Sequence, residues 1–186
     1  QEPPDVYVYN PVDPVPSRGG ANCCDPYFMA SGAFDHRDVE LRSDVLVYST
    51  PSLDQDIEVT GPITVTLYAS SSARDTDFTA KLVDVSQQGD ARNLTDGIIR
   101  ARYRNLQEHA SLIAPGQVYE YTIDLWATSN VFKKGHKIRL EISSSNFPRF
   151  DRNTNTGGEI GEEHGFISAL QTVYHLPEYP SHVTLP

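Results

Sequence analysis

Two pairs of carboxylates are spaced so that they could bind a metal ion. Asp75 and Asp77 are separated by one residue, as are Asp54 and Asp56, and both pairs lie in predicted loops. Carboxylates at this spacing are ligands for hard cations such as calcium. They also accept hydrogen bonds from backbone N–H groups and thereby cap turns. Because neither pair lies within a complete calcium-binding loop, we favour turn capping and expect no metal ion and no cofactor.

No motif for nucleophilic catalysis is present. A serine hydrolase of the α/β class places its nucleophile in a Gly-x-Ser-x-Gly turn between a strand and a helix. Ser31 lies in Met29-Ala30-Ser31-Gly32, which lacks the first glycine and a following helix. Metalloprotease, Walker and dinucleotide-binding motifs are also absent. A triad can be drawn on paper from the serines, acids and histidines of any chain of this length, so we predict that this chain alone is not an enzyme.

The two cysteines, Cys23 and Cys24, are adjacent in the sequence. Neighbouring cysteines cannot link distant strands, and a disulfide between them forms a strained ring. A zinc site needs further ligands, which His36 alone does not supply. We therefore expect two free thiols in a packed loop.

Two long loops are candidates for interface roles. The segment 19–32 carries Tyr27, Phe28 and Met29, large apolar side chains that must pack either against this domain or against a neighbouring one. The segment 154–165 is rich in Gly, Asn and Glu, and its length indicates a functional or interface role. Its charged residues are expected to be solvated.

Aromatic residues could form a carbohydrate platform, in which ring faces stack on a sugar. The candidates are Tyr103, Tyr119, Tyr121 and Trp126. Tyr119 and Tyr121 alternate at strand spacing, which favours burial in a core. Trp126 stands on the opposite face of the same predicted strand, where a core or interface position is favoured over a sugar site.

The segment 118–153 is predicted to organise the sheet that positions these residues. Residues 119–127 alternate, with apolar side chains at the odd positions, and residues 137–144 alternate with apolar side chains at the even positions. Between them, Lys133-Lys134-Gly135-His136 is a turn signal. We predict two antiparallel strands joined at this turn, with one buried face and one wetter face.

The rest of the chain contains further short strands. They are predicted at residues 6–9, 44–48, 58–60, 63–69, 78–85, 91–94, 98–103, 166–175 and 183–185. Asp96-Gly97 is predicted to be a turn, and residues 106–112 one helical turn. Many short strands separated by turns are typical of a sandwich or jelly roll. We predict an all-β jelly-roll β-sandwich, with residues 1–186 forming a single domain entered by a proline-rich arm over residues 1–22.

Composition and charge limit the partners. The chain has 186 residues, of which 38% are hydrophobic, enough for one core. The formal net charge of −10 argues against a nucleic-acid partner. No stretch approaches the ~18 apolar residues of a membrane span, so no membrane partner is expected. Arg100, Arg102 and Arg104 alternate along one predicted strand face, which we expect to be solvated or to face an interface.

Many short motifs, in order along nearly the whole chain, resemble one family. They are Tyr7-Val8-Tyr9-Asn10-Pro11, Pro14-Val15-Pro16, Gly19-Gly20-Ala21-Asn22-Cys23-Cys24, Phe34-Asp35-His36-Arg37, Asp44-Val45-Leu46-Val47-Tyr48, Glu58-Val59-Thr60-Gly61-Pro62, the segments 75–85, 96–104 and 135–153, and Gln171-Thr172-Val173-Tyr174-His175. The chain is similar to the C-terminal, non-catalytic domain of the X-Pro dipeptidyl-peptidase hydrolases, in the cocaine esterase/NonD-type branch.

This resemblance implies a jelly roll of the galactose-binding-domain-like type, docked on an upstream α/β-hydrolase domain with a helical cap. In that family the serine, acid and histidine of the active site belong to the upstream domains, so no catalytic residue carries over onto this chain. The parent would hydrolyse esters or amides through an acyl-enzyme, with dipeptidyl-peptidase or acyl esterase activity.

The resemblance also gives the candidate site residues a role. The domain is expected to support the catalytic domain and to help wall its substrate pocket, through Tyr27, Phe28, Met29 and Trp126. Two alternatives stay open: an independent carbohydrate-binding module, and a scaffold that mediates homo-oligomerisation. The sequence assigns neither the substrate of the parent nor a cellular compartment.

Overall fold

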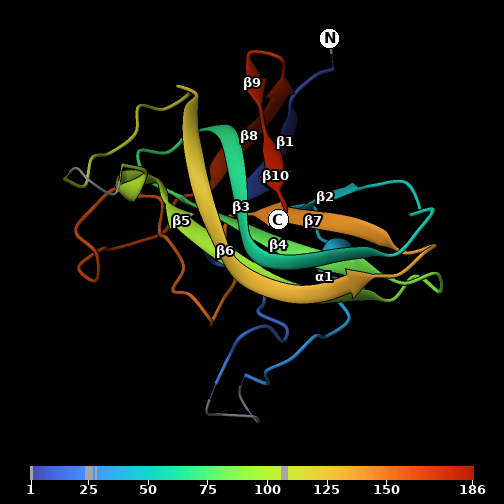
Figure 1. Ribbon diagram of the computed structural model, residues 1–186. Helices are drawn as coiled ribbons and strands as arrows, with labels where there is room; N and C mark the ends of the chain where they lie inside the picture. Colours follow the sequence, from blue (N-terminus) through green and yellow to red (C-terminus); the bar gives the residue numbers. More distant parts are fainter. Residues whose placement is uncertain (1, 24–26, 28, 106–108) are drawn as a thin grey trace.

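The computed structural model describes residues 2–23, 27, 29–105 and 109–186. Two antiparallel sheets pack face to face, with the long strands β3 and β6 lying in front of β4, β5 and β7 (Figure 1). The α-helix among these residues, α1 (Arg37–Glu40), is one turn long. No helix of the described residues is long and apolar enough to cross a membrane. The predicted all-β sandwich is confirmed.

The first sheet is built around the longest strand. Its order is β1 (Asp5–Tyr9), β8 (Ala169–Leu176), β3 (Ile57–Ser71) and β10 (His182–Thr184), with β6 (Tyr119–Phe132) also paired to β3 and β9 (Tyr179–Pro180) paired to β8. The second sheet has the order β2 (Leu46–Ser49), β7 (Lys137–Ser143), β4 (Asp77–Val85) and β5 (Ala91–Arg100). A 3₁₀ turn (Ala101–Tyr103) follows β5.

The core lies between the two sheets and follows the predicted alternation. In β3, Ile63, Val65 and Leu67 point inward and are at most 1% exposed. In β6, the odd positions Tyr121, Ile123 and Leu125 are fully buried. The side-chain period of two in a strand therefore places one face of each of these strands in the core.

The predicted antiparallel pairing of the two central strands is wrong. Both strands exist, as β6 and β7, but β6 pairs with β3 in the first sheet, and β7 pairs with β2 and β4 in the second. The connection through Lys133 and His136 therefore passes from one sheet to the other. Alternation shows which face of a strand is buried. That face is the same whether β6 and β7 pair with each other or lie in different sheets, so alternation does not predict the pairing.

The predicted turn at Asp96-Gly97 is also wrong, because β5 runs through both residues. A Cβ at Gly97 would lie 2.1 Å from the carbonyl oxygen of Asp124. Glycine is thus required here for the close approach of β6 rather than for a turn. Residues 109–112 are not helical, and residues 106–108 of the predicted helical turn lie outside the described residues.

A β-bulge divides β6 at Trp126. The register moves from Pro62–Ala127 to Thr64–Asp124, so β6 has one more residue than β3 across this step. Trp126 has φ of 64°, and its N–H donates to Asp124 Oδ1 at 2.7 Å. Beyond the bulge the inward face changes to the even positions, so Ala127 is exposed and Phe132 is fully buried.

The outer face of the second sheet is buried rather than wet. Glu141 of β7 and Lys81 of β4 are at most 4% exposed, with 3.6 Å between Glu141 Oε2 and Lys81 Nζ. His36 is fully buried; its Nδ1 lies 3.1 Å from Glu141 Oε1, and its Nε2 donates to the Arg18 carbonyl at 2.7 Å. Burial lowers the pKa of Lys81. The segment between β1 and β2 therefore covers this face of the sheet.

Candidate interdomain surface and interior cleft

The loop with the predicted site residues has a fixed base. Gly20 and Gly32 exchange two backbone hydrogen bonds of 2.8 and 3.0 Å, which close the loop. Asn22 Nδ2 donates to the Gly19 carbonyl at 2.8 Å. Gly19 has φ of 65°, and a Cβ there would lie 2.4 Å from the Gly32 oxygen, so this position requires glycine. Because His36 binds the Arg18 carbonyl, the base is also tied to the second sheet.

The candidate residues of this loop lie beyond that base. The loop projects from the end of the sandwich opposite to the N-terminus (Figure 1). Tyr27 is 100% exposed and Met29 is partly buried, while Phe28 lies outside the described residues. Tyr27 is thus not part of the core. The expectation of free thiols is wrong, because Cys23 is disulfide-bonded; Cys24 lies outside the described residues.

Aromatic side chains are also exposed beside the loop base. We call Phe34, Phe147 and Phe166 the aromatic surface; they are 39%, 38% and 47% exposed. The Arg152 guanidinium lies 5.4 Å from the Phe147 ring centroid and 4.7 Å from that of Phe166, which joins these two rings by cation–π contacts. Ser17, just before the loop, donates its N–H to the Phe147 carbonyl at 2.7 Å. The loop and the aromatic surface therefore share one support.

Trp126 does not belong to this group of residues. Its side chain is 72% exposed at the bulge of β6, in the first sheet, whereas Tyr27 and Met29 lie in the loop between β1 and β2. Tyr121 is fully buried, and Tyr119 lies under the Arg104 guanidinium at 4.6 Å. The aromatic residues considered for a sugar platform therefore do not form one surface.

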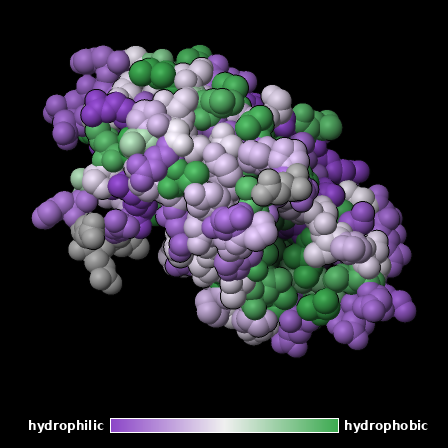
Figure 2. All heavy atoms as spheres, turned by 90° about the horizontal axis from the view of Figure 1, so that it is seen from above, coloured by the Kyte–Doolittle hydropathy of each residue, from purple (hydrophilic) through white to green (hydrophobic). Residues whose placement is uncertain are grey.

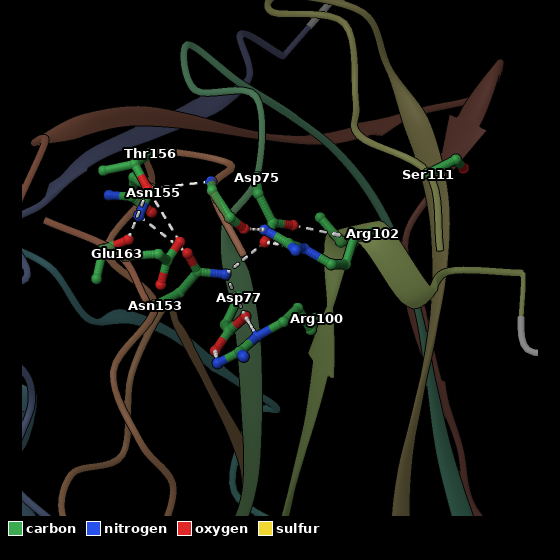
Figure 3. Close-up of polar contacts among 12 residues, drawn as sticks. Asp75, Asp77, Arg100, Arg102, Ser111, Asn153, Asn155, Thr156 and Glu163 are labelled. Carbon is green, nitrogen blue, oxygen red and sulfur yellow. Dashed lines mark hydrogen bonds and ion pairs between the residues drawn. The ribbon is translucent and has the colours of Figure 1, made fainter. Parts of the chain in front are cut away.

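The carboxylates Asp75 and Asp77 are buried in ion pairs (Figure 3). Asp75 Oδ2 accepts from Arg102 Nε at 2.7 Å, and Asp77 Oδ1 accepts from Arg100 Nε at 2.9 Å. Asn153 Nδ2 donates to both acids, at 3.0 and 2.8 Å. The expectation that these arginines are solvated or face an interface is therefore wrong for Arg100 and Arg102, which pair with Asp77 and Asp75 inside the domain.

This cluster leaves no metal site at the acids. The described residues contain no group of three or more His, Cys, Asp and Glu side chains that could hold a metal ion. Asp75 does cap backbone, because it accepts from the Arg102 N–H at 3.0 Å. Asp56 caps the 133–136 turn by accepting from the Lys134 N–H at 2.7 Å. Burial raises the pKa of Asp77 to about 6, although Arg100 and Asn153 favour its charged form.

A histidine–carboxylate pair lacks a nucleophile. His136 Nδ1 lies 2.8 Å from Asp84 Oδ1, an arrangement that orients the base in a catalytic triad. Among the described residues, no serine or threonine hydroxyl is hydrogen-bonded to a histidine ring. The pair lies beside the turn that joins β6 to β7, where its direct effect is to hold that turn.

An open cleft of about 430 Å³ lies between the two sheets, on the side of the molecule where the N-terminus lies. From above, the molecule is hollowed, and hydrophobic side chains are visible in the hollow (Figure 2). The cleft is lined by apolar residues of β3, β4, β7, β8 and β10, and by Tyr48 of β2. At its mouth, Asp5 Oδ2 accepts from the Tyr48 hydroxyl at 2.7 Å and lies 3.3 Å from His175 Nε2. Periodicity could not predict this cleft, because its walls have the same pattern as the filled core.

Comparison with known proteins places the chain in one family. The profile of the X-Pro dipeptidyl-peptidase C-terminal non-catalytic domain matches residues 3–184. Cocaine esterase of Rhodococcus sp. (strain MB1 Bresler) is 49% identical over 100% of this chain, which covers 32% of that protein.

Solved structures agree with this match. An aminopeptidase from the marine sediment archaeon Thaumarchaeota archaeon superposes with a TM-score of 0.88 at 31% identity, over 100% of this chain and 33% of its own. An α-amino acid ester hydrolase superposes with a TM-score of 0.85 at 29% identity, over 100% and 33%. The chain thus spans about a third of the length of these relatives. It belongs to the X-Pro dipeptidyl-peptidase C-terminal non-catalytic domain family, the C-terminal domain of esterase- and peptidase-like hydrolases.

Proposed function

We propose that this domain is the accessory part of a serine ester or amide hydrolase. In this role it packs on a catalytic α/β-hydrolase domain of the same parent chain, helps wall the substrate pocket and has no activity alone. The names of the relatives, an esterase, an ester hydrolase and an aminopeptidase, support ester or amide cleavage as the reaction of the parent.

One observation carries the packing role: the loop that carries the fully exposed Tyr27 has a base that is closed by hydrogen bonds and lies beside the aromatic surface. Exposed apolar side chains on a rigid support are typical of an interface, because their burial by a partner releases bound water without a large loss of chain entropy. Met29 and Phe28 belong to the same loop and are proposed to share this role. Trp126, held outward by the bulge, is proposed as a separate interdomain contact.

Kinetics of the full-length parent test the pocket role. We expect Tyr27→Ala to raise KM by roughly 3- to 10-fold, the effect of about 1 kcal/mol of lost contact. Leu41→Ala is the matched control, because Leu41 is 85% exposed but lies outside the loop. Trp126→Gly tests the second contact without backbone strain, because glycine accepts the φ of 64°.

Unchanged KM and thermal stability in both Tyr27→Ala and Met29→Ala would remove the loop from the substrate pocket and from the interface. A loss of stability without a change in KM would leave a packing role only.

A further inference from the structure

The open cleft extends from the surface into the space between the two sheets. Leu67, Leu82, Ile142 and Val173, all residues of the core, form part of its wall. The volume of about 430 Å³ is far larger than the share of a single water molecule, about 30 Å³. Protein interiors contain few voids larger than one water molecule. A cleft of this size and lining is therefore expected to be filled by apolar groups.

One side of the cleft is bounded by a strand with an unused edge. β2 is at the end of the second sheet and pairs with β7; in the part of the chain that the structure describes, no strand lies on its other side. The Thr50 N–H donates to the Ile138 carbonyl at 3.0 Å, so the even positions of β2 point their backbone groups at β7. In an antiparallel ladder the backbone N–H and C=O groups of the intervening, odd-numbered residues then point away from β7. The N–H groups of Val47 and Ser49 therefore face the free edge.

The opposite side of the cleft is a weaker edge. β10 has three residues and is preceded by Pro180 and followed by Pro186, which have no N–H to donate. Tyr48 and Ser49 of β2 line the cleft directly. An extended segment in the cleft would therefore pair with β2 and lie against β10 through side chains.

The position of the first residues indicates where such a segment comes from. Glu2 and Asp5 lie at the mouth of the cleft, so the part of the parent chain that precedes them must pass close to it. In cocaine esterase about two thirds of the protein lies outside the matched region. A segment attached through a short connection has a high effective concentration at the site.

We propose that an extended segment of the parent chain, from the part that precedes this domain, adds a strand to the free edge of β2 and fills the cleft with apolar side chains at alternate positions. Backbone hydrogen bonds to Val47 and Ser49 supply the pairing, and the apolar walls select the side chains. This inference rests on the proposed function, because the segment belongs to the polypeptide that carries the catalytic domain.

Hydrogen exchange in the full-length parent, followed by mass spectrometry over residues 45–50, tests the pairing. We expect the Val47 and Ser49 amides to exchange at least about 100-fold more slowly than unprotected amides, as for interior strands. Exchange within about tenfold of the unprotected rate at both amides would overturn the proposal. Protection that rises with protein concentration would also overturn it, because a second copy would then occupy the edge.

A proline scan of the edge separates this pairing from general stability. Val47→Pro removes an N–H that points away from β7, whereas Val47→Thr keeps it with a side chain of similar shape. In the parent, Val47→Pro is expected to abolish the protection of Ser49 and leave that of Leu82 in β4 unchanged. Val47→Thr is expected to change neither, and retained Ser49 protection in Val47→Pro would overturn the proposal.

Cleavage of the parent at a protease site inserted before Glu2 distinguishes this inference from the proposed function. If the two pieces co-elute but the Val47 and Ser49 amides are not protected from exchange, the accessory role stays intact and the added strand is rejected. Separation of the pieces, with loss of stability in neither, would reject the accessory role itself.

Discussion

At the residue scale, the buried polar groups attach loops to the sheets. Asp75 lies in the loop before β4, Asp77 in β4, Arg100 in β5 and Arg102 in the turn after β5. Asn153 joins the two acids to the long loop that follows β7 (Figure 3). Arg102 Nη2 also donates to the Gly158 carbonyl at 2.9 Å, further along that loop. Buried charges are costly unless they are paired and hydrogen-bonded. Loss of one member of this cluster would therefore leave a buried partner unpaired. Hydrogen bonds and ion pairs thus connect this loop to the second sheet.

The raised pKa of Asp77 predicts a specific pH dependence of stability. Its pKa is 3.8 when unfolded and about 6 when folded, so the folded state binds more protons between these values. The contribution of this group is therefore fully present below pH about 3.8 and is lost as the pH rises through about 6. From pH 4 to pH 7 we expect the free energy of unfolding of the wild type to fall by on the order of 2–3 kcal/mol relative to Asp77→Asn.

Urea unfolding of the wild type and of Asp77→Asn at four pH values between 4 and 7 measures the difference in their free energies of unfolding. The contributions of other titrating groups cancel in this difference. Asp151→Asn is the control, because Asp151 is 74% exposed and also contacts Arg100. A constant difference between wild type and Asp77→Asn would contradict the raised pKa.

At the scale of elements, one glycine sets the distance between the two sheets at β5 and β6. We expect Gly97→Ala to lower the free energy of unfolding by about 1–3 kcal/mol. The new Cβ would meet the backbone of Asp124, which cannot rotate away as a side chain can. Thermal or urea unfolding measures the loss. Gly158→Ala is the matched control, because the nearest atom to its Cβ is Glu163 Cγ of a flexible side chain. Equal stability of the two variants would contradict the close approach.

Local sequence patterns predicted which faces of the strands are buried but not their partners. The odd positions of β6 and the even positions of β7 are apolar as the alternation predicts, yet the two strands lie in different sheets. Pairing depends on contacts between residues distant in sequence, which alternation does not record.

Glu141 shows a second limit of prediction from alternation, because a polar position in a strand can also be buried. Glu141 lies on the strand face that was predicted to be the wetter one, but the chain between β1 and β2 covers it, and His36, which lies outside any strand, provides its partner.

The candidate site was predicted only in part, for similar reasons. Tyr27 is exposed as an interface residue must be, and that follows from its place in a glycine-flanked loop. The ion pairs of Asp75 and Asp77 were missed because their arginines follow about 25 residues later, on a strand whose twist and 3₁₀ end bring them back. The roles of Tyr27, Phe28, Met29 and Trp126 remain predictions.

At the scale of the whole molecule, the two ends of the sandwich have different properties. The end with the 19–32 loop has a closed loop base and exposed aromatic side chains in contact with Arg152. The side where the N-terminus lies has the open cleft, bounded by the edge strands β2 and β10. Exposed aromatic side chains at one end and an apolar-walled cleft at the other are not expected of a domain that faces solvent on all sides. The two proposed contacts with the rest of the parent chain, one at the substrate pocket and one at the cleft, would account for both features.

Residues 1–186 alone are expected to show no hydrolysis of a simple aryl ester above the buffer rate. The physical reason is that, in the part of the chain that the structure describes, no hydroxyl is hydrogen-bonded to a histidine ring, including that of His136. Release of nitrophenol from 4-nitrophenyl acetate measures the rate, with heat-denatured protein as the control. Turnover that a serine-directed inhibitor abolishes would reveal a nucleophile in this chain and contradict the accessory role.

Addition of this domain to a separately prepared upstream part should instead raise the turnover or the thermal stability of the upstream part, because the domain then covers the apolar surface of that part. If the upstream part gains neither, the two pieces do not act as one enzyme, and independent ligand binding by this domain becomes the better explanation of its exposed aromatic side chains.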